Sequence, residues 1–514
     1  MISFRAQAIG CIMIVPFNIL HFLERGAKIY GDRTAIIDPF LEPNDELKKI
    51  SYQKLWQLVQ AQARAFTKLG IKPGTKIAIL SDNSARFFIS LFSVSGFNRI
   101  LVPINFRLKQ AEINYIIKHS DAEVLLVDEK CHANVSDITI KKFILGPQSD
   151  AELFCYEQQT CDKTADENFA ASINYTSGTT ALPKGVVLTH RNLYVAGLTF
   201  AMHLALRDGE VYLHTLPMFH CNGWGMPYAL SAVGATHVIH QNCTGASIVA
   251  ACKEYKVTQL NGAPMVIQRL IEAMKERPEL FNARHRMRII VAGASPPVKM
   301  IEEIETILGA EFIQLYGLTE TAPLLTTCQK RYEWDDLCPN TRAKKLSQAG
   351  APALGVELAI SAEGEVLAKG NGVLECYYND PSASEEALKD GWFHTGDGGE
   401  ISPLGYLKLT DRKKDMIISG GENISSLEVE DILYLSEKVQ EAAVIGIPDP
   451  TWGEAVKALI VLRLGASSSA EEIIAHCRAH LSHFKCPKYV EFVDELSRTA
   501  TGKLQKYKLR TQYQ

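Results

Sequence analysis

The stretch YTSGTTALPKG, from Tyr175 to Gly185, combines four Ser and Thr residues, two glycines and one lysine. Serine, threonine and glycine let a loop bring hydroxyls and backbone N–H groups close to an anion, and Lys184 adds a positive charge. Phosphate is the ligand that this combination fits best. The stretch therefore predicts a phosphate-binding loop, with a surface loop rich in turn formers as the simpler alternative.

The residues that flank this loop argue against the P-loop of nucleoside triphosphatases. In that motif the lysine follows a glycine, precedes Ser or Thr, and opens a helix. Here Lys184 is followed by Gly185 and VVLTH, a run typical of a strand. Thr189 is then a candidate N-cap for a helix over HRNLYVAGLTFAMHLAL. The pattern predicts a strand, a loop, a second strand and a helix.

The elements that must position this loop are visible as short apolar runs that alternate with stretches of helical period. Examples of the runs are GTKIAIL, RILVPIN, AEVLLVD, GATHVIH, MRIIVAGAS and EFIQLYG. Such alternation predicts an α/β fold with parallel-type sheets flanked by helices on both faces. Because α/β proteins collect ligand groups at the ends of their strands, the small and polar residues after these runs are candidate site residues.

The chain is longer than one hydrophobic core usually organises, so we expect more than one domain. Past about residue 410, the charged passage LTDRKKDMIISGGENISS leads into a compact tail of helices and strands. We predict an N-terminal extension over 1–15, a large domain over 16–410 and a small α+β C-terminal domain over 411–514, joined at Asp411.

Composition restricts the partners. A net charge of −4 with both signs mixed along the chain gives no electrostatic footprint for nucleic acid and no general attraction to an anionic membrane. We therefore expect small-molecule partners. The oligomeric state stays open, a homo-oligomer included.

The twelve cysteines never form a CxxC pair, which argues against a zinc ribbon, a thioredoxin-like site or a disulfide framework. A reducing cytoplasm fits this usage. The apolar run AIGCIMIVP is too short to span a bilayer and lacks a clear cleavage site, although an export signal remains the alternative. Met1 and Met13 both remain candidate start residues.

Further motifs accompany the loop in a fixed order. They are LPMFHCNGW (216–224), AGASPP (292–297), YGLTE (316–320), HTGD (394–397), DRKKDMIISGGENIS (411–425) and RTATGK (498–503). With YTSGTTALPKG, this series resembles the adenylate-forming, AMP-binding superfamily of acyl-CoA synthetases over nearly the whole chain from about residue 16. HCNGWG and the KKDMIISGGENISSLEVE region look most like the medium-chain fatty acyl-CoA synthetases and the plant acyl-activating enzymes.

The resemblance implies an ATP-dependent ligase. A carboxylate, here a fatty acid, attacks the α-phosphate of ATP, expels pyrophosphate and becomes acyl-AMP; the thiol of coenzyme A then displaces AMP. Because negative charge gathers in the first transition state, preorganised donors and cations are its main catalytic device. The implied co-substrates and cofactor are ATP, coenzyme A and Mg²⁺.

The family assigns its nucleotide-binding roles to matching positions of this chain. Glu320 holds Mg²⁺, which prefers oxygen ligands, and Thr319 contacts the α-phosphate. The phosphate loop comprises Thr176, Ser177, Gly178, Thr179, Thr180 and Lys184. The adenine and ribose site comprises Gly293, Ala294, Ser295, Tyr316, Asp397 and Arg412. Without the family, Asp397 reads as a turn residue and Glu320 as a capping or solvated one.

The small domain has two duties in the family. Lys503 bridges the carboxylate and the α-phosphate during adenylation, although by itself it reads as part of a solvated basic tail. Gly420 and Gly421 line the passage for the thiol of coenzyme A, where a bulkier side chain would block the approach. Asp411 is the hinge about which the domain turns between the two steps.

The family also implies an acyl site. His220 lies beside the bound carboxylate, although an isolated His next to Phe is more often a satisfied core residue. The acyl pocket comprises Trp224, Gly225, Asn261 and Gly262. Apolar and small residues dominate around these positions, which suits an uncharged acyl tail and disfavours an amino acid. Chain length and aliphatic or aromatic preference stay open.

Two substitutions depart from the family pattern. Ala181 stands where a glycine is usual in the phosphate loop, and Ser497 stands where a proline usually precedes the lysine motif. We expect a stiffer loop from the first and a less constrained lysine segment from the second. Two alternatives to the synthetase remain: an acyl-AMP ligase that delivers its product to a carrier protein, and a non-catalytic nucleotide-binding relative.

Overall fold

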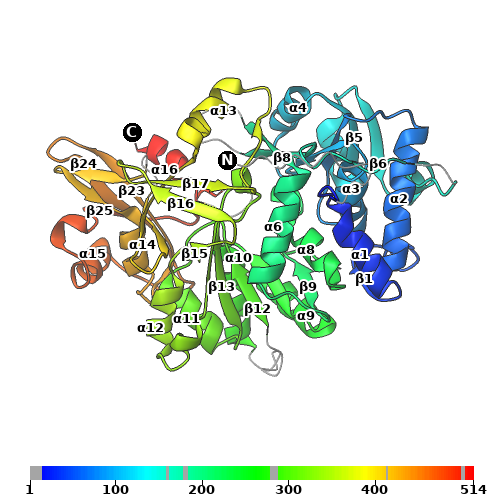
Figure 1. The fold of residues 1–514 in the computed structure, drawn as a ribbon. Helices are drawn as coiled ribbons and strands as arrows, with labels where there is room; N and C mark the ends of the chain where they lie inside the picture. Colours follow the sequence, from blue (N-terminus) through cyan, green and yellow to red (C-terminus); the bar gives the residue numbers. More distant parts are fainter. Residues whose placement is uncertain are drawn as a thin grey trace, which may run out of the picture.

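The computed structural model describes residues 14–157, 161–176, 183–277, 287–411, 415–498 and 504–513. Within these ranges it confirms the α/β fold, with sheets and helices in a large N-terminal part and a smaller C-terminal part. Figure 1 shows β23 (Val439–Asp449), β24 (Gly453–Leu462) and β25 (Tyr489–Phe492) at one end of the molecule, and α2 (Tyr52–Lys68), β5 (Ala122–Asp128) and β6 (Lys141–Leu145) at the other.

A nine-stranded sheet forms the middle of the molecule. Its strands are β1 (Thr34–Ile37), β2 (Lys49–Ser51), β9 (Val211–His214), β10 (Thr236–Ile239), β11 (Gln259–Gly262), β12 (Arg288–Val291), β13 (Glu311–Tyr316), β14 (Thr326–Gln329) and β15 (Ala351–Pro352). Their order is β15-β14-β13-β12-β11-β9-β10-β1-β2. The strands from β1 across to β13 pair in parallel, as expected, and the pairs at both edges are antiparallel.

A seven-stranded sheet carries the predicted phosphate loop. Its further strands are β3 (Lys76–Leu80), β4 (Ile100–Ile104), β7 (Ala170–Thr176), β8 (Lys184–Thr189) and β18 (Cys376–Tyr377). The order is β18-β8-β7-β4-β3-β5-β6, parallel from β7 to β6 and antiparallel at β7–β8 and β8–β18. The strand, loop and strand predicted around Lys184 are therefore an antiparallel hairpin on a parallel sheet.

Two smaller sheets complete the fold. A four-stranded antiparallel sheet contains β16 (Val356–Ile360), β17 (Glu365–Gly370), β19 (Phe393–Ile401) and β20 (Leu407–Leu409). The C-terminal sheet contains β21 (Ile417–Ser419), β22 (Glu422–Ile424), β23, β24 and β25. The chain passes from the first of these sheets to the second through Asp411, the predicted hinge residue.

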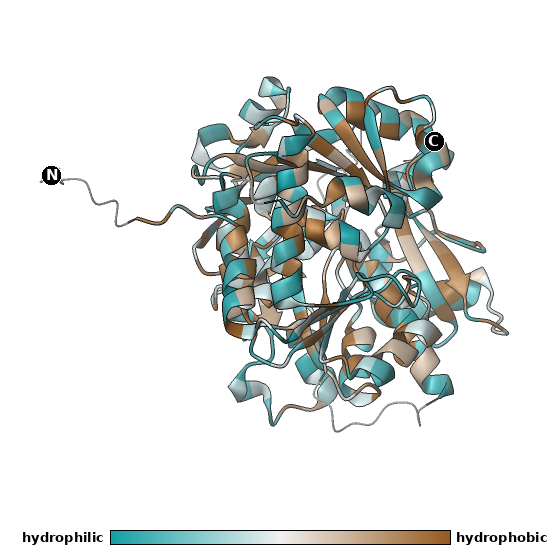
Figure 2. Cartoon of the chain, turned by 90° about the vertical axis from the view of Figure 1, so that its right-hand side faces the viewer, coloured by the Kyte–Doolittle hydropathy of each residue, from teal (hydrophilic) through white to brown (hydrophobic). Residues whose placement is uncertain are grey.

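Helices cover the sheets. Those of the N-terminal part are α1 (Leu20–Tyr30), α2, α3 (Ala85–Ser95), α4 (Gln110–His119), α5 (Pro147–Leu153), α6 (His190–His203), α7 (Cys221–Trp224), α8 (Met226–Ala232), α9 (Gly245–Tyr255), α10 (Pro264–Glu276), α11 (Val298–Thr306), α12 (Pro339–Leu346) and α13 (Pro381–Ala387). The C-terminal helices are α14 (Ser426–Leu433), α15 (Ala470–Arg478) and α16 (Lys506–Gln512). Figure 2 shows hydrophobic residues concentrated in the strands, with hydrophilic residues on the outer faces of surrounding helices.

Two helices show how local sequence sets these elements. Thr189 caps α6 as predicted, because its side chain accepts a hydrogen bond from the backbone N–H of Asn192. Helix α3 begins after Ser84, whose side chain accepts from the N–H of Phe87, and every residue of this helix is buried. A helix that is apolar on nearly all sides belongs inside a core, and α3 packs in the largest hydrophobic cluster.

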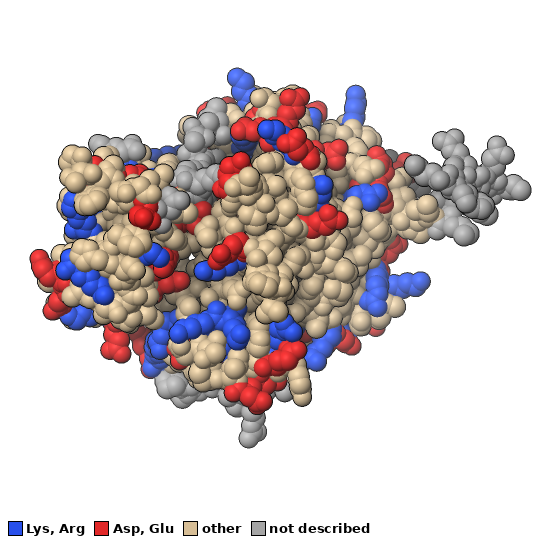
Figure 3. Space-filling model, turned by 60° about the vertical axis from the view of Figure 1, so that its left-hand side comes forward, with Lys and Arg blue, Asp and Glu red and all other residues tan. Residues whose placement is uncertain are grey.

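The molecular surface agrees with the expectation from composition. Figure 3 shows Lys and Arg intermixed with Asp and Glu over the face that it presents. Among the residues that the structure describes, no helix is both long enough and apolar enough to cross a membrane.

Candidate active site

The base of the predicted phosphate loop is a strand pair. Thr176 ends β7 and lies opposite Lys184, the first residue of β8. Ser177, Gly178, Thr179 and Thr180 lie outside the described residues, and so does Ala181. The hairpin therefore fixes both ends of the loop, while α6 follows directly from β8.

Lys184 and Glu320 meet at Tyr377, a residue that the motif analysis did not single out. The Lys184 Nζ lies 5.0 Å from the centre of the Tyr377 ring. The Tyr377 hydroxyl donates to Glu320 Oε1 at 3.0 Å. Burial, reinforced by the charge of Glu320, raises the pKa of Tyr377, so the hydroxyl keeps its proton and remains a donor. Only the pairing of β18 with β8 brings Tyr377 here, and no signal in the local sequence marks it.

The predicted adenine and ribose residues lie around one cavity. Gly293, Ala294, Ser295, Tyr316 and Asp397 all line a cavity of about 410 Å³. The Tyr316 hydroxyl donates to Asp397 Oδ2 at 2.9 Å, and Asp397 is buried. Tyr316 thus orients the carboxylate that the family resemblance assigns to the ribose.

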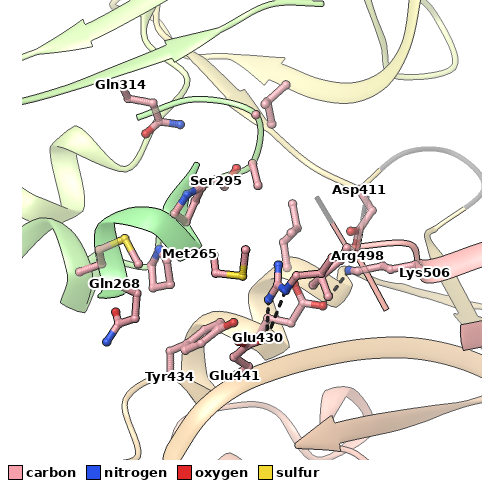
Figure 4. A pocket seen from close by; sticks show the side chains of 18 of the residues that line it. Met265, Gln268, Ser295, Gln314, Asp411, Glu430, Tyr434, Glu441, Arg498 and Lys506 are labelled. Atoms are coloured by element: carbon pink, nitrogen blue, oxygen red, sulfur yellow. Dashed lines mark hydrogen bonds and ion pairs between the residues drawn. The ribbon is translucent and has the colours of Figure 1, made fainter. Parts of the chain in front are cut away.

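The C-terminal part contributes the opposite wall of this cavity. Figure 4 shows Glu430, Tyr434, Glu441, Arg498 and Lys506 directed toward the space that Met265, Gln268 and Ser295 bound from the N-terminal part. Arg498 Nη2 pairs with Glu441 Oε2 at 2.7 Å. The cavity therefore lies between the two parts of the chain. We call it the nucleotide cavity, after the role that the family resemblance assigns to Tyr316 and Asp397 in its lining.

The segment that carries Lys503 is closed at its base. Lys503 lies outside the described residues, as does Arg412. On either side of 499–503, Arg498 forms an antiparallel bridge with Leu504, and the Ser497 hydroxyl donates to Gln505 Oε1 at 3.2 Å. A proline at position 497 has no hydroxyl and could not make the contact with Gln505. Ser497 therefore supplies a constraint of its own at the base of the segment.

A chain of polar contacts joins the predicted hinge residue to the C-terminal helix. The Asp411 carboxylate accepts from the Ser426 hydroxyl at 2.7 Å, and the same hydroxyl accepts from Lys506 Nζ at 2.5 Å. Lys506 also pairs with Glu430 at 2.8 Å, with both side chains nearly buried. Burial lowers the pKa of Lys506, but the Glu430 and Asp411 carboxylates outweigh it, so the net shift is upward and the ammonium stays charged.

Gly420 and Gly421 lie apart from this cavity. They form the turn between β21 and β22, both with positive φ, and Gly420 packs against the ring of Trp452. Neither glycine is among the described residues that line the nucleotide cavity. In this arrangement α16 contributes to the lining of the nucleotide cavity, and the turn with the two glycines does not.

A second, smaller cavity adjoins the first. It measures about 40 Å³ and is lined by His220, Trp224 and Thr319, together with Phe200, Cys221, Ala292, Gly293, Leu315, Gly317, Leu318 and Pro323. Gly293, Leu315, Gly317 and Leu318 also line the nucleotide cavity, so the two spaces adjoin. The arrangement suits a small apolar group that continues from an atom held beside the nucleotide.

The other predicted acyl-pocket residues are close by but do not line this cavity. Gly225, with φ of +69°, packs against the Phe200 ring, and a Cβ there would lie 3.2 Å from it. Asn261 is fully buried in β11, and Gly262 packs against Ile267. Phe200 lines the cavity from α6. The sequence could not predict this role, because the position of Phe200 in the helical pattern is that of an ordinary core residue.

Glu320 offers a single carboxylate as a ligand for a metal ion. This suits a hard cation whose other ligands come from the substrate. Among the described residues no group of three or more His, Cys, Asp or Glu side chains could hold a metal ion. One carboxylate beside a phosphate-binding loop is the arrangement in which Mg²⁺ is commonly held, with the substrate phosphates completing its coordination.

Comparisons with known proteins agree with this geometry. The family models "AMP-binding enzyme" and "AMP-binding enzyme C-terminal domain" match residues 23–378 and 428–503. The 4-hydroxybutyrate–CoA ligase 2 of Metallosphaera sedula is 34% identical, covering 96% of this chain and 94% of that protein. The acetate/butyrate–CoA ligase AAE7, peroxisomal, of Arabidopsis thaliana is 32% identical, covering 96% of this chain and 94% of that protein.

Solved structures give the same result. The o-succinylbenzoate CoA synthetase MenE of Bacillus subtilis, in complex with the acyl-adenylate intermediate OSB-AMP, superposes with a TM-score of 0.80 at 27% identity, over 95% of this chain and 97% of that one. Its complex with ATP and a magnesium ion gives a TM-score of 0.81 at 27% identity, over 96% and 98%. The chain therefore belongs to the AMP-binding enzyme family, the adenylate-forming superfamily that includes the acyl-CoA synthetases.

Proposed function

We propose that this protein is an AMP-forming acyl-CoA ligase that activates a short-chain carboxylic acid with ATP and Mg²⁺ and transfers the acyl group to coenzyme A. The observation that carries the proposal is the 40 Å³ cavity that adjoins the nucleotide cavity. A cavity of about 10–15 Å³ is just large enough for one water molecule. A cavity of about 40 Å³ therefore suits an acyl tail of only a few carbon atoms. We therefore expect acids of about three to five carbons to be preferred over longer fatty acids.

The nature of the cavity wall supports an uncharged acyl tail. Phe200, Trp224, Leu315 and Pro323 supply apolar surface, and the polar lining is limited to His220 and Thr319. An amino acid would bury its ammonium without a carboxylate partner here, which costs several kcal/mol. Two relatives are likewise named for short acids, one for 4-hydroxybutyrate and one for acetate and butyrate.

In the proposed adenylation step, the protein holds the reactants and offsets their charge. His220 and Thr319 line the acyl cavity, and Thr319 directly follows Leu318, which lines both cavities, so we place the substrate carboxylate between His220, Thr319 and the α-phosphate. Asp397, oriented by Tyr316, binds the ribose. Thr176 and Lys184 bind the outer phosphates together with residues 177–180, and Lys503 bridges the two reactants. Mg²⁺, held by Glu320, neutralises phosphate charge when it is bound.

For the second step we propose that the C-terminal domain, residues 411–514, turns about Asp411. The turn brings Gly420 and Gly421 to the cavity and withdraws Lys503. The positions of these residues support this proposal, because α16 faces the cavity here and the two glycines do not. We also propose that residues 16–410 form the large domain that stays fixed during this turn, and that residues 1–15 form an N-terminal extension.

The experiment is pyrophosphate release with ATP and Mg²⁺ over straight-chain acids from acetate to palmitate and several aryl acids, each with and without coenzyme A. We expect one maximum between propionate and valerate, with sustained turnover only when coenzyme A is present. Release that does not depend on coenzyme A would favour delivery to a carrier protein. Absence of acid-dependent release across the panel would favour a non-catalytic relative.

Localisation is a separate proposal. The cysteine usage supports the cytoplasm, and the eleven described cysteines are all free thiols. The name of the Arabidopsis relative includes "peroxisomal", which makes the peroxisome the alternative. Fluorescence microscopy of the full chain, tagged at either end, would distinguish the two.

A further inference from the structure

The wall of the small cavity is built from an unusual backbone. Five consecutive residues, Cys221 to Gly225, all have positive φ, at 36°, 48°, 62°, 53° and 69°. A left-handed conformation costs roughly 1–2 kcal/mol for each residue with a Cβ. For Trp224, a bulky side chain, it is a genuine outlier. The surrounding structure must therefore hold this turn in place.

The turn sets the size of the cavity. Cys221 and Trp224 both line it, and His220 directly precedes the turn. Gly225 ends the turn against Phe200, which lines the cavity from α6. Because Trp224 lines the cavity from within this turn, the place of its ring in the wall depends on the left-handed conformation of the turn.

One side chain anchors the turn on both sides. Asn222 is fully buried, and its Nδ2 donates to the Ser172 hydroxyl and to the Tyr228 hydroxyl, at 3.2 Å in each case. Ser172 lies on β7, the strand that leads to the phosphate loop, and Tyr228 lies on α8. Asparagine also tolerates the left-handed conformation better than most residues. The amide therefore holds the middle of the turn between a strand and a helix.

The partners of Asn222 are themselves held firmly. Ser172 and Tyr228 are fully buried, and the Ser172 hydroxyl also accepts from Asn174 Nδ2 at 2.8 Å. The Tyr228 ring packs edge-on against Phe92 at 5.4 Å between centroids. An anchor on rigid neighbours can transmit their position to the turn, whereas an anchor on mobile ones could not.

We infer that Asn222 is a positioning residue for acid selection: it keeps Trp224 in the cavity wall and thereby sets the longest acyl chain that the enzyme accepts. The inference rests on the proposed ligase function and deepens it. Asn222 does not line the cavity itself, so its effect on selection is indirect. A purely structural role would lower stability or overall activity without changing the preference among acids.

The test compares kcat/KM for propionate, butyrate, hexanoate and octanoate in four variants, measured as acyl-CoA formation. Asn222→Gly keeps the left-handed backbone accessible but removes the anchor. Ser172→Ala and Tyr228→Phe remove one partner each and leave the turn sequence unchanged. Asn18→Gly is the matched control, because Asn18 is also buried and donates to the Thr164 carbonyl, but it lies in a different part of the core.

We expect Asn222→Gly to raise the ratio of kcat/KM for hexanoate over butyrate about tenfold, since a methylene in an apolar pocket is worth 10-fold or more in selection. Ser172→Ala and Tyr228→Phe shift the ratio in the same direction by smaller factors. Asn18→Gly lowers stability and leaves the ratio unchanged.

Two results would overturn the inference. An unchanged ratio in Asn222→Gly, Ser172→Ala and Tyr228→Phe, with reduced stability alone, would assign Asn222 to the core. An equal shift in Asn18→Gly would show that any destabilisation alters the profile. Failure of the wild-type chain to turn over any acid would instead reject the proposed ligase function, and the inference with it.

Discussion

The acyl cavity and the boundary between the two parts of the chain are built from opposite materials. The cavity lies in the large N-terminal part and its lining is mostly apolar, with Cys221 and Trp224 supplied by a left-handed turn that a buried amide anchors. The boundary is lined by charged groups from both parts, and Arg463 of the C-terminal part pairs with Glu272 of the N-terminal part across it. Close packing resists small displacements, whereas polar contacts between two bodies can be exchanged for contacts with water.

This difference assigns selection and turnover to separate regions. Selection among acids that differ by one methylene requires a wall that does not move, and a rigid apolar cavity provides it. Two half-reactions at one site require a part that does move, and a wet, charged boundary allows that. Each prediction below perturbs one side of this division.

The largest effect is expected from Lys503→Ala, which tests the role proposed for this lysine in adenylation. Removal of a preorganised charge at the reacting centre should slow acyl-AMP formation about 10³-fold. Thioester formation from presynthesised acyl-AMP should change less than about threefold. Stopped-flow measurement of each half-reaction checks the split, and an equal loss in both would refute the division of duties within the small domain.

Lys506→Met should cost about 3 kcal/mol of stability, because it leaves Glu430 buried without its partner. Urea unfolding of the full chain, followed by fluorescence and by adenylation rate, measures the loss. The matched control is Lys506→Met with Glu430→Gln, in which the amide oxygen still accepts from the Val444 N–H. We expect the double variant to recover most of the stability; a double variant as unstable as the single one would show that Glu430 does not depend on this lysine.

Acid should weaken the large N-terminal part through His190. Burial lowers its pKa from 6.5 to about 4, and the Ile19 N–H donates to its Nδ1 at 3.4 Å while its Nε2 lies 3.0 Å from the Ser95 carbonyl. The unfolded chain takes up this proton first, so stability is full above pH 6.5 and falls as pH drops toward 4, by up to about 3 kcal/mol.

Thermal unfolding between pH 4 and 8 measures this dependence, and His190→Gln should flatten its share of the slope. His190 opens α6, the helix that carries Phe200 to the acyl cavity. We therefore expect the enzyme's preference among carboxylic-acid substrates to broaden as the pH falls, at a pH where the ion pairs between the two parts of the chain still hold. If stability depends on pH equally in the wild type and in His190→Gln, then His190 is not the group that weakens the fold in acid.

The smallest effect is expected from Arg463→Met at the rim of the boundary. Arg463 Nη1 lies 3.5 Å from Glu272 Oε1, and both side chains are about one-third exposed. An ion pair in such a setting is worth about 0–1 kcal/mol and weakens with salt. The rates of both half-reactions should change less than about threefold at physiological ionic strength. A loss of stability as large as that of Lys506→Met would show instead that this ion pair holds the two parts of the chain together.

Much of the fold and part of the site could be predicted because the signals are local. Thr189 and Ser84 cap their helices from within three residues of the groups that they bind. The apolar runs predicted most of the parallel strands, and the order of motifs predicted the family. Residues such as Tyr377, Phe200 and Asn222 could not be found in this way, because their partners lie far along the chain and their own neighbourhoods read as strand or core.

The sequence by itself determined the family and with it the class of chemistry, since the phosphate loop, YGLTE, HTGD and lysine motifs follow one another in the order typical of adenylate-forming enzymes. Only the tertiary structure decided the size of the acyl cavity and the contacts between the two parts of the chain. The physical reason is that a volume is the space left by many packed side chains, and an ion pair such as Arg463–Glu272 depends on how distant elements fold together. Neither quantity is written in any short stretch of residues.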